Sequence, residues 1–255
     1  MRSAMKKRFM LRAALCGLLL AGAACYAMAD GDALWRIVGE QCLPNQQSQG
    51  KPDPCVEVGQ AVAVLKDRYG ALQYLLIPTS RVSGIESPQL LRDGAPAYWR
   101  EAWRARRYMA LKRGGPVPRQ AVALAINSQY GRSQNQLHIH ISCIDPTVRQ
   151  QVDDLDDSLP RRWRPLPVEL KGHAYWARRV DADRDGNPQG DPFRLLADEL
   201  PGAAEQMGRY GLALLPASFA DGDGFVLLAG RADLLSANRG SAEELQDHDC
   251  KVLDR

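Results

Sequence analysis

The apolar and polar positions of this chain predict short strands interspersed with helices. Residues 61–66 and 72–77 are two apolar runs joined by the turn Asp67-Arg68-Tyr69-Gly70, a pattern that predicts a β-hairpin. Over residues 97–113 the apolar side chains recur at helical spacing, and Gly114-Gly115-Pro116 is expected to end that helix.

The rest of the chain continues in the same way, with a polar loop at 43–55. Further strands are predicted at 122–127, 137–143 and 173–178, a second hairpin at 210–215 with 225–229, and helices at 31–42, after Asp145-Pro146, at 192–207 and within 231–252. Short strands mixed with helices in this order favour an α+β fold with a mostly antiparallel sheet and flanking helices.

Residues 137–141, Leu-His-Ile-His-Ile, alternate between apolar side chains and histidine. Side chains two apart on a strand point to the same face, so His138 and His140 are expected side by side, with the apolar residues on the other face. The chain has four histidines, and half of them lie here. Such a pair suits metal binding, nucleophilic attack on phosphorus or a solvated polar strand face.

The size and charge of the chain limit its class. It has 255 residues, 45% of them hydrophobic, which is enough for one large domain or two small ones with a packed core. Five of its 33 basic residues lie within residues 1–12, which contain no acidic residue, so 28 basic residues face 30 acidic ones in the remainder. That balance excludes the basic footprint of a nucleic-acid-binding protein.

An apolar run rich in Leu, Ala and Gly follows the basic stretch, from residue 13 to residue 29. It is typical of a secretory signal or a short anchor in the inner membrane, and either one places the remaining chain in the periplasm. Ala27-Met28-Ala29 fits a cleavage site, whereas the residues before Cys25 fit a lipoprotein signal poorly. Its length suits both a cleaved and a retained segment, so this choice stays open.

Four cysteines follow residue 29, namely Cys42, Cys55, Cys143 and Cys250. An even number in an oxidising compartment favours disulfides, and three pairings are possible. The preferred pairing joins Cys42 to Cys55 across a short proline-containing loop, and Cys143 to Cys250, which ties the histidine strand to the C-terminus. There is no Cys-x-x-Cys motif, so neither a zinc knuckle nor a thioredoxin-like site is expected.

The sequence around the histidines resembles that of the histidine-triad (HIT) nucleotide hydrolases and transferases. Asn127, Gln134, His138 and His140 stand at that family's spacings, with Asn followed by a loop with Gln and then by alternating His and apolar residues. Residues 72–78 also resemble the family's strand that ends in Ile-Pro. The resemblance implies a HIT-like fold.

One branch of that superfamily is closer, the bacterial CDP-diacylglycerol pyrophosphatases. Segments similar to it lie at residues 40–47, 72–78, 125–128, 138–144, 172–173 and 241–248. Together they extend over nearly the whole chain after residue 29. The resemblance implies a HIT-like catalytic core over residues 30–158 and a C-terminal α+β lobe over residues 159–255 that packs on this core.

The same resemblance implies that the protein hydrolyses CDP-diacylglycerol to CMP and phosphatidate without a cofactor. His140 matches the nucleophile, which attacks the nucleotide phosphorus and carries the nucleotide covalently. Its other ring nitrogen needs an acceptor, and a backbone carbonyl is expected because no carboxylate lies near it in sequence. His138, Asn127 and Gln134 are expected to donate hydrogen bonds to the charge that develops.

The chain departs from the HIT pattern at two positions. Ser142 replaces the third histidine, and its hydroxyl can bind a phosphate but cannot become an imidazolium. Arg81 replaces the histidine that often follows Ile-Pro, and it supplies a cation for the phosphates. Arg132 in the loop before the histidines, and Lys171 with His173 around a glycine, are the remaining candidates for substrate binding.

Three alternatives stay open beside this interpretation. The two histidines could hold a zinc ion together with distant ligands, although we predict no metal. The protein could instead hydrolyse soluble nucleotide diphosphates, or be a disulfide-braced periplasmic binding protein without activity. The partners we expect are a lipid-linked nucleotide and the membrane that contains it, with no nucleic acid.

Overall fold

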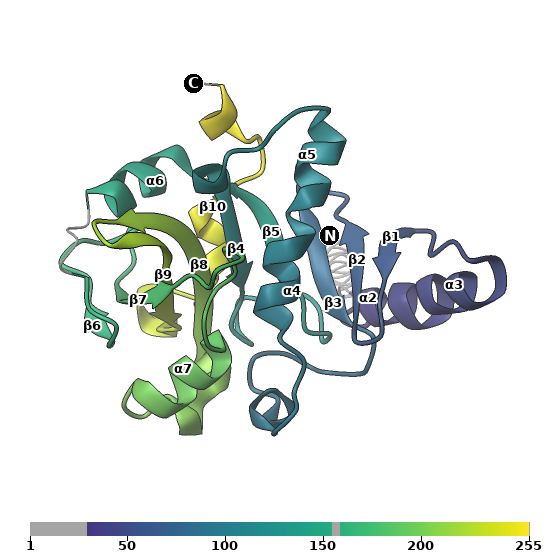
Figure 1. Ribbon diagram of the computed structural model, residues 1–255. Coiled ribbons are helices and arrows are strands. Elements are labelled where there is room, and N and C mark those ends of the chain that lie inside the picture. Colours follow the sequence, from purple (N-terminus) through teal and green to yellow (C-terminus); the bar gives the residue numbers. More distant parts are fainter. Residues whose placement is uncertain (1–29, 155–158, 255) are drawn as a thin grey trace, which may run out of the picture.

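The structure is a computed structural model and describes residues 30–154 and 159–254 (Figure 1). Its strands form one ten-stranded sheet in the order β1-β2-β3-β5-β4-β8-β9-β7-β6, with β10 paired to β5 outside this path. All the strand pairs in it are antiparallel. The predicted α+β class with a mostly antiparallel sheet is therefore confirmed, while the HIT-like fold stays a prediction.

The bounds of the elements follow the chain. The strands are β1 (Cys55–Val58), β2 (Val62–Lys66), β3 (Tyr74–Pro78), β4 (Val122–Ile126), β5 (Ile139–Ile144), β6 (Arg164–Pro165), β7 (Tyr175–Asp181), β8 (Tyr210–Phe219), β9 (Gly222–Arg231) and β10 (Gln246–Asp247). The α-helices are α2 (Ala33–Arg36), α3 (Leu43–Gln49), α4 (Tyr98–Ala105), α5 (Arg107–Arg113), α6 (Pro146–Asp153) and α7 (Pro192–Glu199). A π-helical segment, η1 (Ile37–Cys42), joins α2 to α3, and 3₁₀ turns are η2 (Pro88–Leu91), η3 (Arg119–Ala121), η4 (Ala204–Arg209), η5 (Leu234–Ser236), η6 (Ala242–Leu245) and η7 (Lys251–Leu253).

Both predicted hairpins are present, formed by β2 with β3 and by β8 with β9. The histidine strand β5 lies in the interior of the sheet, where His140 pairs with Leu75 of β3 on one side and with Ala125 of β4 on the other. In Figure 1 the N-terminal helices and β1 lie at one end of the sheet and β6 at the other, with β5 between them.

The alternation of side chains along the strands divides the apolar core between the two faces of the sheet. One face is covered by α4 and α7, where Trp99, Trp103 and Phe193 are fully buried and pack with Ile139 and Ile141 of β5. Because strand neighbours alternate, the two histidines project from the opposite face.

That opposite face carries two separate apolar clusters. One lies under α2 and η1 and includes Leu75. The other lies under α6 and η6 and includes Ala125. Leu75 and Ala125 are the two cross-strand neighbours of His140, so the histidines stand at the boundary between these clusters.

Two predicted helices are shorter than expected. The helix predicted over residues 97–113 is divided at Arg106. Nη1 of Arg106 donates to the carbonyl of Trp103 at 2.6 Å. The backbone carbonyl of Arg106 accepts from the amide of Met109, three residues on, which is a tighter turn than in an α-helix. The helix predicted over residues 192–207 ends at Glu199. The next residue precedes a proline and is extended, with φ −94° and ψ 113°.

Two other predictions for local structure are wrong. Half of the loop predicted at 43–55 is helical, because Pro44 fits the first turn of α3 and Gly50 ends it at a φ of 67°. The helix predicted within residues 231–252 is absent, and η5, η6 and η7 occur instead. Ala237 and Gly240, with φ values of 60° and 63°, are left-handed and interrupt any helix there.

Both preferred disulfides are present. Cys42–Cys55 joins the end of η1 to β1, and Cys143–Cys250 joins β5 to the C-terminal segment, with Cα–Cα distances of 5.6 Å and 5.1 Å. Near the second bridge, Asp247 of β10 pairs with Cys143. The C-terminal segment is therefore held beside the histidine strand by a covalent bond and by strand pairing.

The sheet runs without a break past residue 159, where we predicted the boundary between core and lobe. Leu124 of β4 pairs with Leu214 of β8, and β10 pairs with β5. The division into a core and a lobe stays a prediction. The predicted signal or anchor, residues 1–29, lies outside the described residues, and within residues 30–154 and 159–254 we find no helix long and apolar enough to cross a membrane.

Candidate active site

His138 and His140 line a cleft of about 920 Å³ on the second face of the sheet. Five parts of the chain form its walls, namely α2 with η1, Pro54 before β1, the β2–β3 hairpin, the loop before β5, and the segment 241–248 around η6 and β10. The other lining residues are Ala33, Leu34, Ile37, Pro54, Leu65, Lys66, Asp67, Arg68, Tyr69, Gly70, Leu75, Ser133, Gln134, Ser241, Glu243, Glu244, Gln246 and His248.

A carboxylate orients the ring of His140. Its Nδ1 lies 3.2 Å from Oε1 of Glu243. Burial lowers the pKa of His140, although Glu243 and Asp67 act in the opposite direction, and we take the ring as neutral. Nε2 of Gln73 also lies 3.3 Å from Nδ1. A neutral ring with its hydrogen on Nδ1, on the side of the carboxylate, keeps a lone pair on Nε2, and this nitrogen is buried without a hydrogen-bond partner.

Two polar side chains hold Glu243 in this position. Asn127 donates from Nδ2 to Oε2 at 3.1 Å, and its Oδ1 accepts from the backbone amide of Glu243 at 3.1 Å. Gln73 donates to Oε1 at 3.3 Å. Burial tends to raise the pKa of Glu243, but the nearby His140 ring and these hydrogen bonds outweigh it and hold that pKa below its ordinary value. The carboxylate is therefore ionised at neutral pH.

His138 is fixed in a defined tautomer as well. Its Nδ1 donates to the carbonyl of Gln136 at 2.7 Å, so Nε2 carries the lone pair. Burial, followed by the neighbouring His140, lowers the pKa of His138 to about 4. The two rings lie edge to face with centroids 4.8 Å apart. At neutral pH Nε2 of His138 carries no hydrogen and can only accept a hydrogen bond. The predicted hydrogen bond from His138 to phosphate therefore requires this nitrogen to be protonated first.

The other two residues predicted from the HIT spacing differ in their position. Gln134 lines the cleft, where it accepts from the amide of Leu34 at 3.0 Å and donates to the carbonyl of Asp30 at 3.1 Å. It connects the loop before β5 to the start of α2. Ser142 is completely buried behind the cleft, and its hydroxyl has no hydrogen-bond partner.

Each of the four further residues predicted to bind substrate through a basic side chain is paired with a carboxylate, away from His138 and His140. The pairs are Arg81 with Asp32, Arg132 with Glu86, Lys171 with Asp145, and His173 with Glu244. Only the last pair reaches the lining of the cleft, and it does so through its carboxylate. The substrate contacts of these four residues stay predictions.

Two cations that the sequence reasoning missed line the cleft beside the histidines. Nζ of Lys66 donates to the carbonyls of Asp67 and Gly70 at 2.6 Å and 2.8 Å. The guanidinium of Arg68 lies 4.7 Å from the ring centroid of Tyr69, and it forms no ion pair with the described residues. The hairpin turn was predicted, but its position above the histidine strand depends on the fold.

Glu243 was missed for a similar reason. It is far from the histidines in sequence, and the expected acceptor for His140 was a backbone carbonyl. The segment 241–248 was nevertheless among those that resemble the pyrophosphatase branch, which was an available signal. Over residues 30–154 and 159–254 no group of three or more His, Cys, Asp or Glu side chains is arranged to hold a metal ion.

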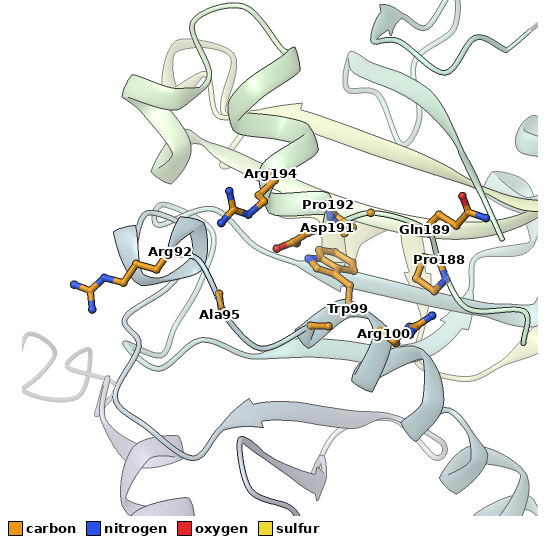
Figure 2. A pocket seen from close by; sticks show the side chains of 12 residues that line it. Arg92, Ala95, Trp99, Arg100, Pro188, Gln189, Asp191, Pro192 and Arg194 are labelled. Carbon is orange, nitrogen blue, oxygen red and sulfur yellow. The ribbon is translucent and has the colours of Figure 1, made fainter. Parts of the chain in front are cut away.

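A second hollow, of about 560 Å³, lies between α4 and α7 on the face opposite the histidines (Figure 2). Trp99 lines it with an indole Nε1 that is buried and unpartnered, and Asp191 lies beside it. Asp191 is occupied in capping α7, since it accepts from the amide of Phe193 at 3.0 Å. Because its lining contains neither histidine nor cysteine, we place the chemistry in the histidine cleft.

The chain is similar to known proteins over nearly its whole length. The family model for CDP-diacylglycerol pyrophosphatase matches residues 29–254. A relative from Yersinia pestis, named CDP-diacylglycerol pyrophosphatase, is 50% identical over 257 residues, which cover 99% of this chain and 98% of the relative. The protein is a hydrolase, as predicted. It belongs to the CDP-diacylglycerol pyrophosphatase family, while its place in the wider HIT superfamily stays a prediction.

Proposed function

We propose that this protein hydrolyses the phosphoanhydride of CDP-diacylglycerol to CMP and phosphatidate through a covalent nucleotidyl-histidine. Family membership supports the substrate. The observation that carries the mechanism is the unpartnered Nε2 of His140 on a neutral ring whose Nδ1 faces the Glu243 carboxylate. An imidazole held in this way is a nucleophile that divides one difficult displacement into two easier ones.

In the first step the lone pair on Nε2 of His140 attacks the phosphorus of the CMP unit. A P–N bond forms, the bond from this phosphorus to the bridging oxygen breaks, and phosphatidate leaves with the electron pair. The ring is then cationic because Nδ1 keeps its hydrogen, and the carboxylate of Glu243 stabilises that charge. Lys66 and Arg68 stabilise the negative charge on the departing phosphate.

In the second step water attacks the same phosphorus. His138 takes a proton from this water through the lone pair on Nε2, the P–N bond breaks, and its electron pair returns to His140 as CMP leaves. His138 then releases the proton to solvent. Phosphate charge in the cleft raises the pKa of His138 above the value of about 4 that burial gives it, which makes it a better base.

Asn127 and Gln134 take positioning roles in this proposal. Asn127 acts through Glu243, whose second carboxylate oxygen it holds at 3.1 Å. Gln134 holds α2 against the loop before β5, through its hydrogen bond to the amide of Leu34. The N-terminal segment keeps the catalytic body in the periplasm, and the mass of the mature protein tests whether residues 1–29 remain attached.

His138 is the second candidate for the nucleophile. Its tautomer is fixed by the Gln136 carbonyl, and its Nε2 also keeps a lone pair. Nε2 of His140, in contrast, is buried, so in-line attack requires neighbouring atoms to move aside as substrate enters. The positions implied by the HIT resemblance favour His140.

A trapping experiment distinguishes the two. The protein is mixed with CDP-diacylglycerol labelled at the phosphorus of the CMP unit and then denatured, and label is expected on His140. His140→Ala and His140→Asn are expected to lose label and turnover, whereas His138→Ala keeps the label and hydrolyses it slowly. Full turnover in His140→Ala, with none in His138→Ala, would reverse the assignment. Activity that survives dialysis against a chelator argues against the zinc alternative.

A further inference from the structure

One side of the histidine cleft is apolar. We name this side the apolar wall; it consists of Ala33, Leu34, Ile37, Pro54, Leu65 and Leu75. The rest of the lining includes the histidines, Lys66, Arg68 and the carboxylates, and it is polar apart from Tyr69 and Gly70. The cleft therefore offers one polar region suited to a diphosphate and one region that favours hydrocarbon.

The apolar wall is a firmly built part of the fold. Leu34, Leu65 and Leu75 are buried members of one cluster, and Ile37 is half-buried and packs against them. The Cys42–Cys55 disulfide joins the end of η1 to β1 behind this cluster. Such a surface keeps its shape when a ligand enters, which reduces the entropy lost on binding.

The apolar wall also lies directly beside the reacting group. Leu75 is the cross-strand neighbour of His140, and Leu65 precedes Lys66 in β2. A substrate whose phosphorus is at His140 can therefore place one of its two ends against the apolar wall. In a lipid-linked cytidine diphosphate, the end with hydrocarbon is the diacylglycerol.

We propose that the apolar wall binds the first carbons of the substrate's acyl chains and so selects lipid-linked cytidine diphosphates over soluble ones; this inference rests on the proposed function. A volume of about 920 Å³ is near the upper end of the range of about 300–1,000 Å³ for ligand pockets. It accommodates the head group and the start of the chains, and the remaining hydrocarbon stays in the bilayer.

The sequence supports the same orientation. The apolar wall begins at Ala33, and only Asp30-Gly31-Asp32 separates it from the apolar run that ends at residue 29. A segment that directs this part of the chain to the membrane brings the wall close to the acyl chains. The two apolar features are therefore adjacent along the chain.

The test compares two substrates with the same phosphoanhydride, CDP-dioleoylglycerol in detergent micelles and CDP-glycerol, which has no acyl chain. The substitution is Ile37→Gln, which keeps the length of the side chain and a residue that favours helix. The ratio of kcat/KM for the lipid to kcat/KM for CDP-glycerol is expected to fall ~10-fold, the size typical of a lost apolar contact in a specificity pocket. The matched control is Leu111→Gln on α5, which is 71% exposed and outside the cleft, and which should leave the ratio unchanged.

The outcomes separate this inference from the proposed function. Two results together support the proposed role of the apolar wall. The ratio of kcat/KM values falls in Ile37→Gln. The lipid also binds more weakly to the inactive double variant, His140→Ala with Ile37→Gln, than to His140→Ala alone. A wild-type protein that hydrolyses both compounds equally well, or an unchanged ratio in Ile37→Gln, overturns the inference and leaves the chemistry intact. A wild-type protein that hydrolyses neither overturns the proposed function and the inference together.

Discussion

Oε1 of Glu243 lies 3.2 Å from Nδ1 of His140, so a carboxylate from the C-terminal segment orients an imidazole of the central strand β5. The two residues are far apart in sequence and are brought together because β10 pairs with β5 and Cys250 is bonded to Cys143. In the proposed mechanism this carboxylate favours the tautomer of His140 with hydrogen on Nδ1 and stabilises the cation that forms when Nε2 reacts.

Glu243→Gln is expected to lower kcat by about 10- to 100-fold, the range typical of outer hydrogen-bond partners of functional histidines. It also removes a charge that raises the pKa of His140. Because the active ring is neutral, activity is lost as pH falls through this pKa, so the acid limb of the rate profile should move to lower pH. The control is Glu205→Gln, which changes an exposed carboxylate outside the cleft. An unchanged profile would contradict the assignment.

The buried His138 should make the protein less stable in mild acid. Its pKa is lowered from 6.5 to about 4, so the unfolded chain binds a proton at a pH where the folded protein does not. Stability is complete above pH 6.5 and decreases as pH falls from about 6.5 to 4, by about 3 kcal/mol for this group. Urea unfolding at pH 7 and pH 4.5 measures the change, and His138→Gln should reduce it. An equal loss in this variant would show that other groups are responsible.

Arg68 is expected to contribute more to substrate binding than Arg81. Arg68 lines the cleft and forms no ion pair with the described residues, whereas Arg81 is paired with Asp32 outside it. Arg68→Ala should raise KM about 10-fold, and more at low salt, because a charged contact to phosphate is screened by ions. Arg81→Ala is the matched comparison, and a larger effect there would restore the role predicted for Arg81 from the sequence.

Gly211→Ala should disturb the segment that carries Glu243. A Cβ at Gly211 would collide with the carbonyl oxygen of Gly240 and lie 3.1 Å from the amide of Ala242. The added methyl group should reduce the free energy of unfolding by about 1–3 kcal/mol and lower kcat through displacement of the carboxylate. Gly115→Ala, where a Cβ meets nothing within 4 Å, should change stability by less than about 0.5 kcal/mol. Equal stability of both variants would contradict this close packing.

The two disulfides should differ in their effect on stability. Cys143–Cys250 closes a separation of 107 residues and Cys42–Cys55 one of 13, so loss of the first releases more chain entropy on unfolding. Replacing Cys143 and Cys250 by serine should destabilise the protein by about 2 kcal/mol more than the same change at Cys42 and Cys55. Thermal unfolding measures this difference, and the opposite order would show that native packing controls it.

The sequence predicted the parts of the site that depend on neighbours along the chain. The alternation around His138 and His140 gave the strand and its polar face, and the turn residues gave both hairpins. The preferred cysteine pairing was also confirmed. Glu243 could not be placed in this way, since its contact with His140 arises from the order of strands in the sheet.

The wrong helix predictions have a related cause. Helical periodicity over residues 97–113 does not reveal that Arg106 bonds the carbonyl of Trp103 and interrupts the helix. Near the C-terminus, residues with helical preference are held in turns because the segment must cross from β9 to pair beside β5. Tertiary contacts decided the local structure in both regions.

The pairing of β4 with β8 determines how the chain can be divided. Leu124, Ala125 and Ile126 bond to a strand from the other side of residue 159. A fragment ending before β8 would expose a flat, apolar strand edge with unpaired amides and carbonyls, the kind of surface that self-associates. Such a truncated product is expected to aggregate rather than persist as an independent unit.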